Sequence, residues 1–148
     1  MMENKWNNRF MDMAKAVSLW SKDPSTKVGA VAVGSKKQIL ATGFNGFPRG
    51  ISDTIERLEN REIKYDYIVH AEKNLIYNAS YTGTSLDGAA IYVYGLPVCL
   101  ECAKGIIQVG ISEIYVSKEC LMSKPNWYDS WLKSKAMFEE VGLFVDLV

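Results

Sequence analysis

The chain has 148 residues, about the length of one domain, and 48% of them are hydrophobic. This fraction is enough for a packed core and excludes a disordered segment. Lys and Arg number 17, as do Asp and Glu, so the net charge is zero. A dedicated nucleic-acid-binding protein needs a basic surface to neutralise phosphates, and no apolar run approaches the roughly 20 residues that span a bilayer. We therefore expect one domain over 1–148, with neither a nucleic-acid strand nor a membrane as partner.

Cysteine and histidine are scarce, with three Cys and a single His, His70. Two of the cysteines form the sequence Cys99-Leu-Glu-Cys102. The polar segment from Met1 to Asn8 lacks the apolar region of an export signal, so we expect a reducing cytoplasm. In that compartment a CxxC pair favours metal or redox chemistry over a structural disulfide.

Hydrophobic periodicity predicts the first elements. A helix is expected over about residues 5–21, where apolar residues recur at steps of three and four: Phe10, Met13, Ala14, Val17 and Trp20. The almost wholly apolar segment 28–33 predicts a strand buried on both faces, and 39–44 predicts a second strand. Because the connection 34–38 is short and polar, the two strands should pair as an antiparallel hairpin.

The charge-rich segment 52–66 has two possible interpretations. One is a short helix anchored by Ile55 and Leu58, with Ser52 or Asp53 as its N-cap. The other is a solvated excursion on the surface.

Helices and strands alternate in the second half of the chain. We expect helices from His70, from near Cys99 and over 126–141, and strands over 89–94, 113–117 and 143–148. Such alternation implies an α/β fold with helices on both faces of a mixed sheet. The last two strands are joined by a helix and should therefore run parallel.

The residues that carry chemistry stand at two predicted helix starts. His70 and Glu72 open one helix, and Cys99 and Cys102 open another. Two such starts can face each other at the carboxyl end of a sheet. One imidazole and two thiolates supply three zinc ligands and leave a fourth position for water, as in catalytic zinc sites. Glu72 lies about 200° around the helix from His70, so we assign it to proton transfer rather than to metal binding.

Two other interpretations of the cysteines remain open. A strand followed by CxxC at a helix start is also typical of a thioredoxin-type redox site. A structural zinc module is the third possibility, although such modules normally use four protein ligands. The remaining cysteine, Cys120, follows a strand in a polar stretch and is interpreted as a bystander.

The two motifs resemble the signature of the zinc-dependent nucleobase and nucleotide deaminases, H-x-E followed by P-C-x-x-C. Here they read His70-Ala-Glu72 and Pro97-Val-Cys99-Leu-Glu-Cys102, with Val98 inserted between the proline and the first cysteine. Four stretches are similar to the deoxycytidylate (dCMP) deaminases, of phage and cellular type: 21–30, 43–50, 70–74 and 102–108. The resemblance covers most of residues 5–118. It implies a three-layer α/β/α, cytidine-deaminase-like fold around a five-stranded mixed sheet.

This resemblance implies the hydrolytic deamination of dCMP to dUMP and ammonia. A zinc-bound hydroxide, with the zinc held by His70, Cys99 and Cys102, would attack C4 of cytosine while Glu72 acts as proton shuttle. The alternative is a deaminase of another base or nucleoside. Relatives that use free cytidine usually place Cys where His70 stands, and the tRNA adenosine deaminases act on a polyanion, which the zero net charge disfavours.

The substrate contacts that follow are Asn45 on the sugar, Thr26 and Lys27 on the 5′-phosphate, Ala71 and Val98 on the base, and Tyr128, or its neighbour Trp127, stacked on the ring. The resemblance also implies a homohexamer that dCTP activates and dTTP inhibits, with Mg²⁺ accompanying the triphosphate. The Gly-rich loop 43–50 is either a plain connector or the effector site, which would use Gly43, Asn45, Gly46 and Arg49. The protein would act in the cytoplasm, or in the host cytoplasm if it is phage-encoded.

Overall fold

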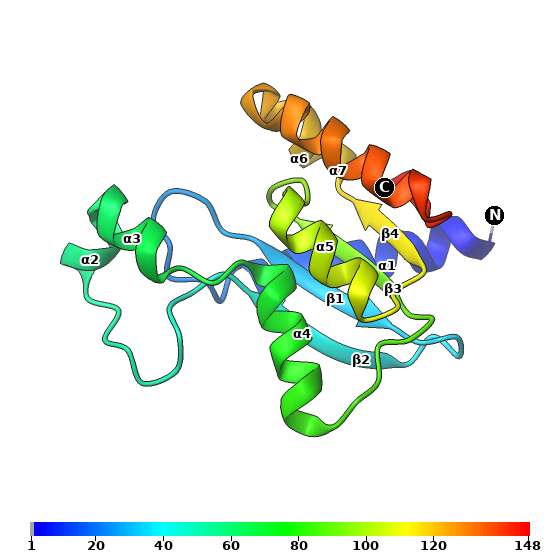
Figure 1. Cartoon of the computed structure of the whole chain (residues 1–148), viewed down its shortest axis with the longest axis horizontal. Coiled ribbons are helices and arrows are strands. Elements are labelled where there is room, and N and C mark those ends of the chain that lie inside the picture. The colour runs from blue at the N-terminus through cyan, green and yellow to red at the C-terminus, as the bar shows by residue number, and fades with distance from the viewer. Residues whose placement is uncertain (1) are drawn as a thin grey trace.

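The computed structural model describes residues 2–148, with side chains from residue 5 onward. Figure 1 shows the elements, which follow one another along the chain as α1 (Met2–Ser18), β1 (Gly29–Val33), β2 (Ile39–Phe44), α2 (Ile55–Glu59), α3 (Arg61–Tyr67), α4 (Ala71–Thr82), β3 (Ala90–Tyr94), α5 (Leu100–Gln108), β4 (Glu113–Val116), α6 (Lys118–Ser123), the 3₁₀ turn η1 (Pro125–Trp127), α7 (Tyr128–Glu140) and β5 (Phe144–Leu147). Among these described helices, none combines the length and the apolar character that a bilayer crossing requires.

The five strands form one mixed sheet in the order β2-β1-β3-β4-β5. β1 pairs antiparallel with both β2 and β3, whereas β3–β4 and β4–β5 are parallel pairs. The antiparallel hairpin and the parallel last pair were both predicted, and both are confirmed. Every residue of β1 is buried, as expected for a strand covered on both faces.

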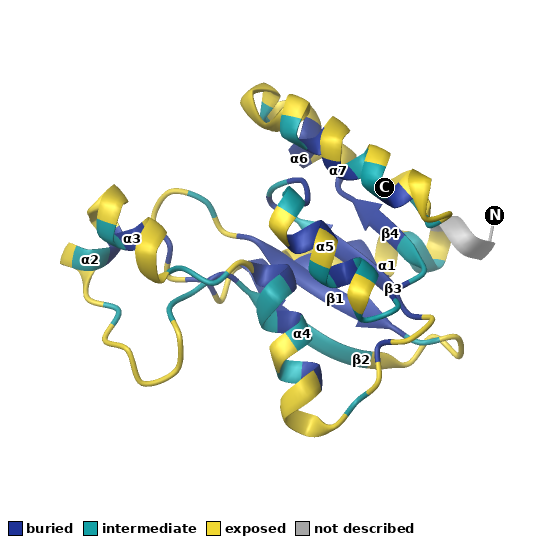
Figure 2. Cartoon of the chain, viewed as in Figure 1, coloured by how far each residue is buried: buried dark blue, intermediate teal, exposed yellow. Residues whose placement is uncertain are grey.

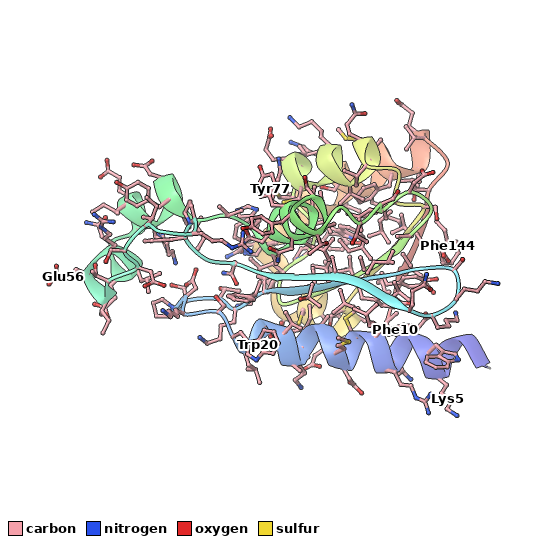
Figure 3. All side chains as sticks on the ribbon, turned by 90° about the horizontal axis from the view of Figure 1, so that it is seen from below. Lys5, Phe10, Trp20, Glu56, Tyr77 and Phe144 are labelled. Carbon is pink, nitrogen blue, oxygen red and sulfur yellow. The ribbon has the colours of Figure 1, made fainter. Side chains whose placement is uncertain are left out.

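Helices cover both faces of the sheet, which confirms the three-layer α/β/α prediction. Figure 3 shows α1 along one face and α4 and α5 along the other, and α7 joins α5 and β5 on that second face. Figure 2 shows the central strands β1, β3 and β4 mostly buried between these layers, whereas the edge strand β2 is mostly of intermediate burial. The core accordingly divides in two. Phe10, Ala14 and Val17 of α1 pack on one face, and Leu75, Ile106 and Phe138 of the other helices pack on the opposite face.

One end of the sheet gathers three chain segments that are far apart in sequence. β1 begins at Gly29, which pairs with the last residues of β2 and β3, Phe44 and Tyr94. The segment that leads into β1 and the segments that leave β2 and β3 therefore meet at this end. A further bridge pairs Gly46 with Val69, so the chain arrives here again directly before α4.

The structure corrects several boundaries. The first helix ends at Ser18, so Trp20 lies beyond the apolar stripe and is 63% exposed. The N-cap of α2 is Thr54, whose side chain accepts from the Arg57 N–H, and not Ser52 or Asp53. The helices α3, α6 and η1 were not predicted individually. Each is seven residues or shorter, too short to show a clear hydrophobic period.

Candidate active site

The two motif residues that begin helices leave their side chains free of capping. His70 is the N-cap of α4 and Cys99 is the N-cap of α5, and both have extended backbone angles. N-cap side chains usually bond to backbone N–H groups of the first turn, but neither of these does. The imidazole and the thiol are therefore available for other partners at the sheet end described above.

These side chains come together with Cys102, one turn further along α5. The His70 Nδ1 atom lies 3.4 Å from the Cys99 Sγ atom and 3.5 Å from the Cys102 Sγ atom. The three ligand atoms lie within 4.8 Å of one another, close enough to hold a single metal ion. Cys120, on α6, lies outside this group.

The protonation of the group favours a bound cation. Hydrogen bonds from Cys102 and then His70 lower the pKa of Cys99 to about 4, whereas the bond to Cys99 and burial raise the pKa of Cys102. Cys99 is therefore the more readily ionised thiol of the pair, and Cys102 is the one that keeps its proton. A bound divalent cation would stabilise both as thiolates. One imidazole and two thiolates fit Zn²⁺ with a fourth position open.

Glu72 lies beside this group in the first turn of α4 and is almost fully buried, with 3% exposed. Burial raises the pKa of Glu72 to about 7, because a carboxylate without water loses solvation. A carboxyl group with a pKa near the working pH can both accept and return a proton. The position suits proton transfer next to the metal-binding group.

A cavity of about 270 Å³ opens over these residues. His70, Glu72 and Cys99 line it, and three of the predicted substrate residues, Thr26, Asn45 and Ala71, line it as well.

The other three predicted substrate residues do not line this cavity. The Lys27 ammonium group donates to the Ser21 carbonyl oxygen. Val98, the extra residue after Pro97, is 1% exposed and packs in the core, whereas Pro97 lines the cavity. Tyr128 lines a separate hollow between α6, α7 and β5, whereas its neighbour Trp127 lines the cavity.

Asn45 is held firmly by the segment before β1. Its Oδ1 atom accepts from the Val28 N–H at 2.8 Å, and its Nδ2 atom donates to the Thr26 carbonyl oxygen at 2.9 Å and to Asp23 at 3.4 Å. Both amide hydrogens are therefore used within the protein, and one lone pair of the oxygen remains. Asn45 can accept a hydrogen bond from a bound hydroxyl group but has no donor to spare.

Sequence reasoning missed one whole side of the cavity. A face of α3 and the residue that follows it contribute Arg61, Lys64, Tyr65 and Ile68 to the lining. Their spacing of three and four residues could have indicated a helix face, but three of the four are polar or aromatic, so no hydrophobic stripe marked it.

A buried ion pair fixes α3 against the rest of the site. The Lys64 ammonium group lies 3.1 Å from the Asp23 carboxylate, with side chains 9% and 7% exposed. Asp23 also accepts from the backbone N–H groups of Ser25 and Thr26. Removing one member of such a pair leaves an uncompensated buried charge, which costs far more than losing a surface pair.

We expect Asp23→Ala to lower the free energy of unfolding by about 3 kcal/mol, because it leaves the Lys64 ammonium buried without a counter-charge. Asp53→Ala is the matched control, since it breaks the exposed pair with Lys22 and should cost less than about 1 kcal/mol. Urea unfolding of both variants measures the difference. Equal losses would show that the buried pair does not support α3.

The four residues predicted for an effector site have different surroundings. Asn45 belongs to the cavity, and Gly46 pairs with Val69. Gly43 lets α4 pack closely on β2, because a Cβ atom there would collide with the backbone of Ala71 and Leu75. The Arg49 guanidinium donates to Asn78 and lies over the Tyr81 ring, two turns or more along α4 from His70.

Comparison with known proteins agrees with this geometry. The family model described as the cytidine and deoxycytidylate deaminase zinc-binding region matches residues 4–118. The chain belongs to this family. All three proposed metal ligands and Glu72 lie inside the matched region.

Individual relatives and solved structures extend the comparison. A deaminase encoded in the luxG 3′ region of Aliivibrio fischeri is 42% identical over 144 residues, covering 97% of this chain and 94% of that protein. Human deoxycytidylate deaminase is 42% identical over 115 residues, covering 74% of this chain and 63% of the human protein. The dCMP deaminase of cyanophage S-TIM5, also solved in complex with dCMP and dUMP, superposes with a TM-score of 0.74. At 23% identity, covering 97% of this chain and 98% of that chain, it shows that the fold is shared.

Proposed function

We propose that this chain, as a single deaminase domain over 1–148, hydrolyses dCMP to dUMP and ammonia. The observation that carries the proposal is the buried carboxyl group of Glu72 beside the His70, Cys99 and Cys102 ligand group, at the base of a cavity that can take a small molecule. The family supports a substrate that contains cytosine. Relatives named deoxycytidylate deaminases, at about 40% identity, support dCMP as that substrate.

The residues divide the reaction between them. Zn²⁺ held by His70, Cys99 and Cys102 would supply a Lewis acid that makes a water molecule nucleophilic near neutral pH. Glu72 can transfer the two protons of the attacking water in turn, the first to N3 of the ring and the second to the departing amino group, which leaves as ammonia. The N–H groups in the first turn of α4, at Ala71, have no partner within the helix and can bond to the base. The free lone pair of Asn45 accepts from a sugar hydroxyl.

Ammonia release from a panel of dCMP, CMP, deoxycytidine, dCTP and adenosine tests this proposal. We expect turnover with dCMP to exceed turnover with every other member. A preference for deoxycytidine or adenosine would support the alternative, a deaminase of a free nucleoside. A metal-free protein with a reversible Cys99–Cys102 disulfide and no ammonia release would support the redox interpretation instead.

Trp127→Ala should raise KM for dCMP by roughly tenfold to a hundredfold, because base stacking on an aromatic ring contributes about 1–3 kcal/mol. Tyr128→Ala is the matched control. The two side chains are adjacent and similarly exposed, at 42% and 48%, but only Trp127 lines the cavity. Steady-state kinetics measures both. A larger effect at Tyr128 would place the stacking residue where the sequence had predicted it.

We further propose that the protein acts in the cytoplasm as a homohexamer that dCTP with Mg²⁺ activates and dTTP inhibits. The support is the family resemblance, together with three free cysteines that suit a reducing compartment. Rates measured with each triphosphate test the regulation, and light scattering tests the assembly. An unchanged, hyperbolic saturation curve would contradict the effectors, and a monomeric mass would contradict the hexamer.

A further inference from the structure

The α3 helix presents two cations to the cavity, and they are not equivalent. Arg61 and Lys64 stand three residues apart on the face that also carries Tyr65. Lys64 is buried and its ammonium group bonds to Asp23 and to the Ser25 hydroxyl at 3.1 and 3.2 Å. Its charge is therefore balanced inside the protein.

Arg61 is exposed and forms no ion pair with any of the described side chains. The nearest ring is that of Tyr65, 6.0 Å from the guanidinium carbon. Because Asp23 already accepts from Lys64, Asn45 and two backbone N–H groups, it has little capacity left for Arg61. Arg61 is thus the cavity's uncompensated positive charge.

The other nearby cations are occupied or face elsewhere. The Lys27 ammonium group is taken by the Ser21 carbonyl oxygen. The Arg57 guanidinium donates to the Ser52 carbonyl oxygen and lies over Tyr67, and Arg57 does not line the cavity.

The position of Arg61 along the chain separates it from the reacting groups. Arg61 begins α3, and Tyr67 ends it three residues before His70. This helix rises roughly 9 Å between those two residues, so Arg61 lies at the end of α3 away from the residues that lead into α4. Figure 1 shows α2 and α3 standing out from the body of the fold, beyond the start of α4.

We propose that Arg61 recognises the 5′-phosphate of the substrate and that the Asp23–Lys64 pair holds α3 in position for this contact. This inference rests on the proposed function, because it assigns the phosphate end of the same site. A guanidinium group binds phosphate oxygens in a bidentate manner, and an arginine without an internal partner loses no existing ion pair when it does so. The α3 segment then selects nucleotides over nucleosides, and Lys27 takes no part.

The test compares Arg61→Gln with wild type, with Arg61→Lys and with the control Arg57→Gln, which removes an arginine from the same segment outside the cavity. For each protein, kcat/KM is measured with dCMP and with deoxycytidine, without added triphosphate, so that no effector phosphate contributes. Calorimetry measures the binding of dCMP and deoxycytidine independently of turnover.

We expect Arg61→Gln to weaken dCMP binding and lower kcat/KM for dCMP by roughly tenfold to a hundredfold, as for the loss of a charged hydrogen bond. Its values for deoxycytidine should not change, Arg61→Lys should restore part of the loss, and Arg57→Gln should match wild type. Equal losses for dCMP and deoxycytidine, or no loss in Arg61→Gln, would overturn the assignment. If no protein releases ammonia from dCMP but Arg61→Gln still loses dCMP affinity selectively, the proposed function fails and the phosphate contact stands.

Discussion

Glu72→Gln is expected to lower kcat for dCMP by about 10²–10⁴-fold, the range of general acid–base catalysis by one positioned group. The substitution keeps the size of a side chain that is almost fully buried, so the fold and the metal-binding group should persist. It removes the group whose pKa, raised by burial to about 7, allows proton exchange near neutral pH. Steady-state kinetics and zinc analysis on the same preparation check both parts.

Glu101→Gln is the control for this result. Glu101 lies on α5 next to Cys102, but its side chain is exposed and pairs with Lys104 on the surface. It should turn over like wild type. A Glu72→Gln protein that is fully active while holding zinc would remove Glu72 from the chemistry.

Cys99→Ala is expected to lose the metal, and with it turnover and stability. The wild-type chain should hold about one zinc ion. The variant should hold close to none, because it lacks one of the three protein ligands. A ligand at 1,000 times its Kd stabilises the folded state by about 4 kcal/mol, so Tm should fall on the order of 10 °C. Metal analysis and thermal unfolding measure the two effects.

Cys120→Ala separates loss of zinc from loss of any buried cysteine. Cys120 is also buried, at 7% exposed, but it lies on α6 outside the ligand group. It should keep the zinc and the turnover of wild type. Loss of zinc from Cys120→Ala together with retention in Cys99→Ala would contradict the proposed ligand set.

The parts that sequence could predict are those encoded locally. The hairpin and the parallel last strands follow from connection length, because a short polar link allows only an antiparallel pair and a helical crossover favours a parallel one. The ligand group follows because His70 and Cys99 each begin a helix after a strand or bridge, at the same end of the sheet. The spacing of residues within the two motifs indicates both helix starts directly.

The parts that it could not predict depend on tertiary placement. Trp127 and Tyr128 are adjacent and similar in type, and only the turn η1 decides which one faces the cavity. Lys27 and Arg61 are both cations near the site, and only their hydrogen bonds show that Lys27 is occupied. Whether Pro97 or Val98 faces the cavity likewise depends on how the core packs around this segment.

The product balance of the purified, zinc-loaded chain with dCMP alone tests the assignment of this site most directly. We expect dUMP and ammonia to form in equal amounts, at a rate that Glu72→Gln lowers by about 10²–10⁴-fold and Glu101→Gln leaves unchanged. Unreacted dCMP, at a zinc content that shows the ligand group to be filled, would contradict the assignment of this site to dCMP deamination.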